Sequence, residues 1–223
     1  MPRNLRPLLA LLLTLTGVAL IRADIAGARE QVYLFKPLAT GIILASVLFA
    51  PPRPSSRYRA LIAGGLVLSL VGDVLLMLPV NLFAAGLGAF LIAHLCYVSA
   101  FATHGGGRDS SRVAILPFAA VAATMLLYLW PSLGALRAPV VLYIGVIATM
   151  AWQGWARFTR VRTGGAKRAA WGALFFLVSD GTLAVNKFRG PIGDKATVTI
   201  VVLGTYLVAQ WLIASSVGDE QPG

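Results

Sequence analysis

Two aspartates stand inside strongly apolar stretches of this sequence. Asp180 lies near the middle of FFLVSDGTLAVNKF (residues 175–188), and Asp73 lies in LVGDVLL (residues 70–76). An ionisable group in such a stretch is expensive unless it is paired or used, so it indicates a functional site. When two carboxyl groups meet, one can donate a proton while the other activates water. The pair therefore predicts acid–base chemistry, with Asp73 and Asp180 as candidate catalytic residues.

Other polar residues accompany these aspartates. Lys36 opens an apolar stretch, whereas Asn186 and Lys187 close the stretch that holds Asp180. Because Asp180 and Lys187 are seven residues apart, they would share one face of a helix. A purely structural alternative is that Asp73 pairs with Lys36 and Asp180 with Lys187, and that both pairs only lock the helices together.

His94 has two equally good interpretations. It lies in FLIAHLCY, where Phe90 and Tyr97 fall on the same helical face. It is either a hydrogen-bonded packing histidine or a residue of the site. His104, in a Gly-rich segment, is expected to be solvated.

The composition indicates the solvent in which these groups lie. The chain has 223 residues, of which 58% are hydrophobic and 12% charged, and its mean hydropathy is +0.80. A soluble domain of this length could not cover so much apolar side chain, so a bilayer is the natural solvent. The net charge is +11, but the basic residues fall in short gaps between apolar runs, as in membrane proteins. This distribution argues against nucleic acid as a partner.

The sequence offers little for metal or cofactor chemistry. Cys96 is the single cysteine, so the chain can form neither an internal disulfide nor a thiolate metal site. Two histidines are too few for a three-histidine zinc site. The sequence contains no Gly-rich phosphate loop and no Gly-x-Ser-x-Gly elbow. We therefore expect no metal and no cofactor.

The apolar runs predict an all-α polytopic membrane bundle of about eight transmembrane helices, forming one domain over residues 1–223. A spanning helix needs about 20 apolar residues. The predicted spans cover roughly residues 6–22, 33–50, 59–78, 81–103, 112–130, 138–157, 168–186 and 197–216. The gap at 78–81 is so short that the third and fourth helices should form an antiparallel hairpin.

The charges of the gaps predict the orientation. The N-terminus and the even-numbered gaps hold twelve lysines and arginines, against seven in the odd-numbered gaps. The positive-inside rule then places both termini in the cytoplasm. With a rise of about 1.5 Å per residue, Asp73 and Asp180 each lie about 8 Å below the outer ends of their helices, and His94 about 10 Å deeper than Asp73. Both aspartates should therefore face one polar pocket in the outer half of the bundle.

The first apolar segment has a competing interpretation as a secretory signal. Arg3 and Arg6 precede it and small residues follow it. Arg22, directly after the apolar run, argues against cleavage. Removal of this segment would leave seven spans.

Four motifs together resemble a known family. YLFKPLAT, LVGDVLLML, GLGAFLIAHLCY and FFLVSDGTLAVNKF resemble, in this order, motifs of the YhhN-type lysoplasmalogenase family, over roughly residues 33–212. The resemblance implies a multi-pass membrane hydrolase that cleaves the vinyl ether of lysoplasmalogen, giving a fatty aldehyde and glycerophospho-ethanolamine or -choline. The residues that it implicates are Lys36, Asp73, His94, Asp180, Asn186 and Lys187.

The implied chemistry suits these residues. Protonation of the alkene carbon needs a carboxylic acid kept neutral by an apolar site, and a second carboxylate would hold water and stabilise positive charge. Asp73 and Asp180 are expected in these two roles, in either order. Lys36 and Lys187 would bind the lipid phosphate, Asn186 would orient water or the glycerol hydroxyl, and His94 is a further candidate contact. A related ether or ester lysolipid is an alternative substrate.

The Arg-, Ala- and Gly-rich composition suggests a bacterial cytoplasmic membrane protein, with a lysophospholipid and the bilayer as its partners; the sequence indicates no protein partner. The leading rival is a proton-coupled transporter in which Asp73 and Asp180 relay protons. A third interpretation is a purely structural membrane protein. The sequence has no strong Gly/Pro break inside the third or the seventh predicted helix, which argues mildly against transport.

Overall fold

The computed structural model describes residues 5–50, 56–103 and 112–219, and these residues form helices and no strands. The eight α-helices are α1 (Leu5–Ala26), α2 (Arg29–Leu48), α3 (Ser56–Met77), α4 (Phe83–Ala102), α5 (Leu116–Leu129), α6 (Arg137–Val161), α7 (Gly164–Phe188) and α8 (Lys195–Ser216). Short 3-10 turns are η1 (Arg112–Ile115), η2 (Trp130–Ser132), η3 (Gly134–Leu136) and η4 (Val217–Asp219). Each predicted span corresponds to one α-helix, so the predicted all-α bundle is confirmed.

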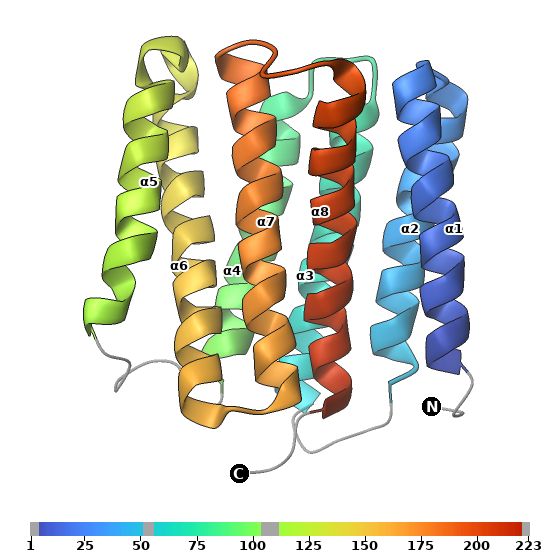
Figure 1. Ribbon diagram of the computed structural model, residues 1–223, viewed down its shortest axis with the longest axis vertical. Coiled ribbons are helices and arrows are strands. Elements are labelled where there is room, and N and C mark those ends of the chain that lie inside the picture. Colours follow the sequence, from blue (N-terminus) through green and yellow to red (C-terminus); the bar gives the residue numbers. More distant parts are fainter. Residues whose placement is uncertain (1–4, 51–55, 104–111, 220–223) are drawn as a thin grey trace.

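Seven of these helices are long and apolar enough to cross a membrane by length and composition, and α5 is the shorter one. The 3-10 turns η1 and η2 extend α5 at both ends, so that this part of the chain runs along α6 for most of the height of the bundle (Figure 1). The chain is thus a multi-pass membrane protein. The start of α1 and the end of α8 lie at the same end of the bundle (Figure 1).

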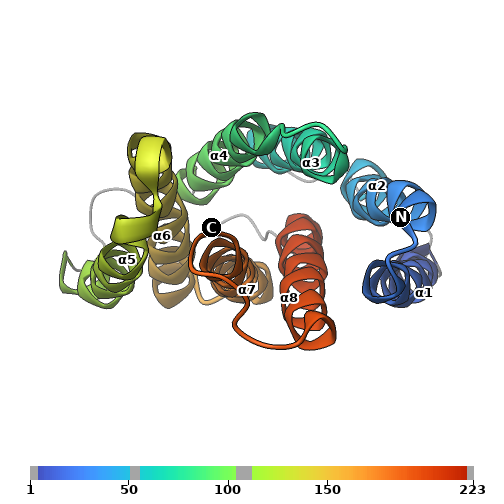
Figure 2. The ribbon, with the colours of Figure 1, turned by 90° about the horizontal axis from the view of Figure 1, so that it is seen from above.

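The helices form two layers. Figure 2 shows α2, α3 and α4 as one row, while α1, α8 and α7 lie in the facing row and α5 and α6 close one end. Consecutive helices α3 and α4 pack against each other, as the short gap between them predicts, and α7 packs closely against α8. Gly172 permits the latter contact, because a Cβ there would lie 2.9 Å from the carbonyl oxygen of Ala209.

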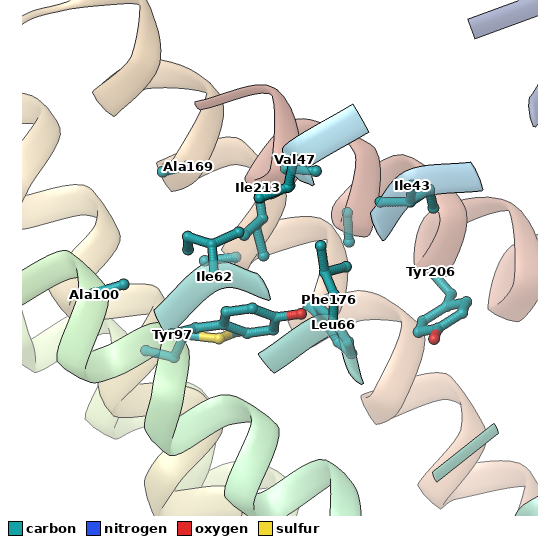
Figure 3. Close-up of a cluster of buried hydrophobic side chains, with 14 of the residues drawn as sticks. Ile43, Val47, Ile62, Leu66, Tyr97, Ala100, Ala169, Phe176, Tyr206 and Ile213 are labelled. Carbon is teal, nitrogen blue, oxygen red and sulfur yellow. The ribbon is translucent and has the colours of Figure 1, made fainter. Parts of the chain in front are cut away.

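Aromatic and branched side chains fill the space between the layers. Tyr97 from α4, Phe176 from α7 and Tyr206 from α8 lie near one another in this core (Figure 3), and all three are almost fully buried. Two of these rings carry hydroxyls, which need hydrogen-bond partners because a buried polar group without one is costly. The core is therefore partly polar, and its polar part adjoins Asp73.

Two side-chain caps begin the helices that form the centre of one layer. Thr163 accepts a hydrogen bond from the Ala166 N–H (3.2 Å) at the start of α7. Asp194 accepts from the N–H (2.9 Å) and the hydroxyl (2.6 Å) of Thr197 at the start of α8. The bonds from Thr197 lower the pKa of Asp194. These caps satisfy N–H groups that a helix start leaves without an internal partner.

Candidate active site

A cavity of about 130 Å³ lies between the two layers, and both aspartates line it. Lys36 also lines it, and most of the other lining side chains are apolar. These include Leu87, Met125, Val140, Ile144, Leu177, Leu183 and Leu203. The sequence expectation that the two aspartates face one pocket therefore agrees with the geometry, although the pocket is mostly apolar.

Asp73 is surrounded by donors. The Nζ of Lys36 lies 3.3 Å from Oδ1 of Asp73, and the aspartate side chain is 2% exposed. The Thr40 hydroxyl donates to Oδ2 at 2.8 Å, and the Tyr206 hydroxyl donates to the same oxygen at 2.6 Å. An ammonium and two hydroxyls together stabilise the ionised carboxylate.

A line of buried hydrogen bonds continues from Tyr206. The Gln210 amide donates to the Tyr206 hydroxyl at 3.3 Å, and the Tyr97 hydroxyl donates to the Gln210 amide oxygen at 2.8 Å. Ser69 lies 3.5 Å from the Tyr97 hydroxyl. This line crosses α3, α4 and α8 and fixes the hydroxyl that reaches Asp73.

Asp180 has fewer partners. The Tyr143 hydroxyl of α6 donates a hydrogen bond to its Oδ2. The Nε2 of His94 lies 3.9 Å from the same oxygen, which is beyond hydrogen-bond distance. No lysine or arginine of the described residues lies within 4 Å of this carboxyl group. Its side chain is 15% exposed, so Asp180 is open to the cavity without a fixed cation beside it.

His94 lies behind Asp180 inside an aromatic cluster. Its ring centroid is 4.6 Å from that of Phe176 and 5.3 Å from that of Tyr143, both edge to face. It is fully buried, and within the described part of the chain neither ring nitrogen has a hydrogen-bond partner. Of the two interpretations from the sequence, the hydrogen-bonded packing histidine is therefore not what the structure shows.

The structure does not bring Asn186 and Lys187 to this cavity. Neither side chain lines it. Lys187 is exposed and its Nζ lies over the Phe83 ring, 5.1 Å from the centroid. The alternative pairing of Asp180 with Lys187 is absent from the described ion pairs, whereas the pairing of Asp73 with Lys36 is present. A lysine at a helix end extends toward the aqueous boundary, which overrides the shared helical face.

Sequence reasoning missed Thr40, Tyr143 and Tyr206. A buried tyrosine hydroxyl requires a partner, so tyrosines within apolar spans were a usable signal. Tyr206 and Gln210 are four residues apart, which is also the spacing of polar neighbours on one helical face. The sequence does not show which of the two carboxyl groups each of these hydroxyls binds.

A family model and the sequences of individual known proteins both match this chain. The model of the YhhN family matches residues 31–217. The chain is 36% identical to human lysoplasmalogenase TMEM86B over 163 residues, which cover 73% of this chain and 66% of that protein. It is 31% identical to a lysoplasmalogenase of Mycobacterium tuberculosis over 191 residues, covering 81% of this chain and 69% of the relative.

A third relative carries no activity in its name. The chain is 31% identical to the uncharacterized membrane protein YhhN of Escherichia coli over 134 residues, or 59% of this chain and 62% of that one. The chain thus aligns with 69% of the length of the mycobacterial relative, 66% of the human protein and 62% of the Escherichia coli protein. No solved structure matches.

Proposed function

This chain belongs to the YhhN family, and from that membership and the two-aspartate cavity we propose that it is a membrane hydrolase that cleaves the vinyl ether of a lysoplasmalogen. The observation that carries the proposal is the pair of carboxyl groups in one apolar cavity, of which only Asp73 has a fixed cation. Relatives named lysoplasmalogenase support the same reaction. The products would be a fatty aldehyde and glycerophospho-ethanolamine or -choline.

The difference between the two carboxyl groups supports a proposed division of roles. Asp180, which has no lysine or arginine beside it, holds a proton and delivers it to the alkene carbon one bond away from the ether-bearing carbon. The ether-bearing carbon then becomes an oxocarbenium centre. Ionised Asp73 stabilises its positive charge and orients the attacking water.

Asp180 regains its proton in the second half of the reaction. Water adds to the oxocarbenium carbon, and its released proton returns to the Asp180 carboxylate. The resulting hemiacetal collapses when its hydroxyl proton moves to the glycerol oxygen, which breaks the old ether bond and leaves the aldehyde. Tyr143 holds Asp180 in position throughout.

Other sequence predictions belong to the same proposal. The sequence predicts that Lys36 binds the lipid phosphate; because its ammonium is engaged with Asp73 in the cavity lining, we propose instead that it contacts the glycerol side of the substrate. Asn186 and Lys187, at the end of α7, stay predictions for contacts to a part of the lipid outside the cavity. His94 supports Asp180 from behind. From the Arg-, Ala- and Gly-rich composition we also propose the bacterial cytoplasmic membrane, and from the distribution of basic residues we propose that both termini lie in the cytoplasm.

The test compares wild type, Asp73→Asn and Asp180→Asn in detergent, with aldehyde release from lysoplasmenyl-ethanolamine as the readout. Loss of an acid or base group is expected to slow turnover by about 10²- to 10⁴-fold. Glu30→Gln is the matched control, because Glu30 is an exposed acid of α2 outside the cavity. If either aspartate variant releases aldehyde at the wild-type rate, the catalytic role proposed for that residue is wrong.

One observation favours a second candidate, a proton-coupled transporter. The hydrogen bonds from Asp73 through Tyr206, Gln210 and Tyr97 are the kind of buried line along which protons move. Under this alternative, wild type releases no aldehyde from any lysolipid, and proteoliposomes show proton flux that Asp73→Asn abolishes. Aldehyde release by wild type that requires both aspartates contradicts it.

A further inference from the structure

A second cavity opens at one end of the bundle and adjoins the first. It has a volume of about 640 Å³ and lies between the end of α1, the start of α2, the end of α3 and the start of α8. Lys36, Leu76 and Leu203 line both cavities. We refer to this second cavity as the vestibule. These shared residues form a junction between the vestibule and the two-aspartate cavity.

The vestibule is charged where the inner cavity is apolar. Arg29, Lys36 and Lys195 supply three cations to its lining, and Asp24 supplies one carboxylate. Lys36 is engaged with Asp73. Among the described residues, no carboxylate lies within 4 Å of Arg29 or Lys195. Two cations and one acid are therefore available to a ligand.

The lining residues come from helices that are tied together at this point. The Lys195 ammonium of α8 donates to the carbonyl oxygen of Ile25, at the end of α1, at 3.3 Å. The Thr199 hydroxyl of α8 donates to Asp24 at 2.6 Å. These contacts join α8 to the end of α1, where Lys195 and Asp24 both line the cavity. The positions of the Lys195 ammonium and the Asp24 carboxylate are thus fixed by contacts between α1 and α8.

We propose that the vestibule binds the zwitterionic head group of a lysophospholipid, with its phosphate on Arg29 and Lys195 and its ammonium on Asp24. The proposal rests on the proposed function, since it names the head-group subsite of the same substrate. Arginine and lysine are the side chains that bind phosphate through charge-assisted hydrogen bonds. A single carboxylate beside them matches the single ammonium of an ethanolamine or choline head group.

The order of the two cavities matches the order of groups along such a lipid. The head group joins the glycerol, and the glycerol joins the chain through the ether bond. With the head group in the vestibule, the glycerol lies at the Lys36 junction and the ether bond beside Asp73. The chain then continues into the apolar cavity, which Asp180 also lines. A free phosphate would leave the apolar cavity unused.

The experiment measures binding of a lipid that the proposed reaction does not cleave. The probe is 1-O-alkyl-glycero-3-phosphoethanolamine, whose saturated ether has no alkene carbon to protonate, and the reference is 1-O-alkylglycerol, which lacks the head group. The variant is Arg29→Ala/Lys195→Ala. The matched control is Arg22→Ala/Arg137→Ala, which removes two exposed cations that line neither cavity.

We expect the dissociation constant of the phosphoethanolamine lipid to rise about tenfold in the Arg29/Lys195 variant, and not in the control. Binding of the alkylglycerol should stay unchanged in both. If the Arg29/Lys195 variant binds both lipids equally more weakly, or binds neither more weakly, the proposal that the vestibule holds the head group is overturned. Asp24→Asn should abolish any preference for this lipid over 1-O-alkyl-glycero-3-phosphate, and an unchanged preference overturns the role of Asp24.

Failure of this proposal can be told apart from failure of the proposed function. If wild type releases aldehyde but the Arg29/Lys195 variant binds the phospholipid normally, the vestibule is wrong and the hydrolase stands. If wild type releases no aldehyde but binds the phospholipid through Arg29 and Lys195, the head-group site stands and the reaction is wrong.

Discussion

Asp73 meets an ammonium and two hydroxyl donors, whereas Asp180 meets a single phenol in front of an aromatic cluster. The surrounding sequences are nevertheless alike, since LVGDVLL and LVSDGTL share Leu-Val-small-Asp-x-x-Leu. The difference comes from the helices that pack against each aspartate. Asp73 is reached from α2 and α8, and Asp180 from α6 and α4. The local motif thus places a carboxyl group within an apolar span, and the helices packed against it determine which hydrogen-bond donors and cations surround that group.

The largest contrast is expected in stability. Asp73→Asn leaves Lys36, whose side chain is only 15% exposed, without its counter-ion, which costs about 3–5 kcal/mol. Asp180→Asn removes no ion pair with lysine or arginine and costs about 1 kcal/mol. Thermal unfolding in detergent measures both. Lys36→Met/Asp73→Asn should recover most of the loss, and equal unfolding temperatures for the two single variants would break the comparison.

The next contrast concerns the two phenols that reach the carboxyl groups. Tyr143→Phe removes the one hydroxyl seen on Asp180 among the described residues. A hydrogen bond to a charged group is worth about 1.5–3 kcal/mol, and Asp180 becomes charged when it delivers its proton. We expect a loss of about 10- to 100-fold in kcat/KM for aldehyde release. Tyr206→Phe should cost less, because Thr40 and Lys36 still hold Asp73. A larger loss in Tyr206→Phe would contradict this ranking.

The glycines beside the aspartates provide a third contrast. A Cβ on Gly72 would lie 2.6 Å from Cδ2 of the Phe90 ring, so Gly72→Ala forces the ring to move and should cost about 1–3 kcal/mol. A Cβ on Gly181 would meet the flexible end of Met125 at 3.1 Å. Gly181→Ala should therefore be nearly neutral. Unfolding midpoints of the two variants test this, and equal destabilisation would refute it.

The smallest contrast involves two smaller hydroxyls, that of Thr40, which binds Asp73, and that of Ser179, which precedes Asp180 in the sequence. Thr40→Val removes one of three partners of Asp73 and should slow aldehyde release several-fold, for a loss of about 1 kcal/mol. The Ser179 hydroxyl donates to the Val202 carbonyl oxygen at 3.0 Å instead of to Asp180. Ser179→Ala should therefore leave the rate unchanged and lower only the unfolding midpoint. A slower rate of aldehyde release in Ser179→Ala would contradict this prediction, because it would show that the reactivity of Asp180 depends on the Ser179 hydroxyl.

The fold could be predicted because bilayer solvation acts on each segment separately. Apolar runs of about 20 residues between Pro/Gly-rich gaps define the spans without knowledge of any contact. The same physics marks Asp73 and Asp180, because a charge in an apolar run stands out in the sequence itself. The short α5 with its 3-10 turns is a local detail that hydropathy does not resolve.

The partners of the aspartates could not be predicted in the same way. Tyr143 and Tyr206 resemble other aromatic residues of the spans until the packing of α6 on α7 and of α8 on α3 is known. Lys187 shows the converse, because its helical face matches Asp180 while its length and terminal position take it to Phe83. The charged vestibule was also missed, since it forms only where α8, the last helix, packs beside the ends of the first three helices.

The helices that reach each aspartate also have an order of synthesis. An aspartate at the centre of an inserting helix costs about 2.5–3.5 kcal/mol. Lys36 of α2 is made before Asp73 of α3, and Tyr143 of α6 is made before Asp180 of α7, so each acid enters the bilayer when a partner is already there. Tyr206 belongs to the last helix, α8. Biogenesis can thus insert both acids in sequence order, while the hydrogen-bonded surroundings of Asp73 are completed only when the final helix arrives.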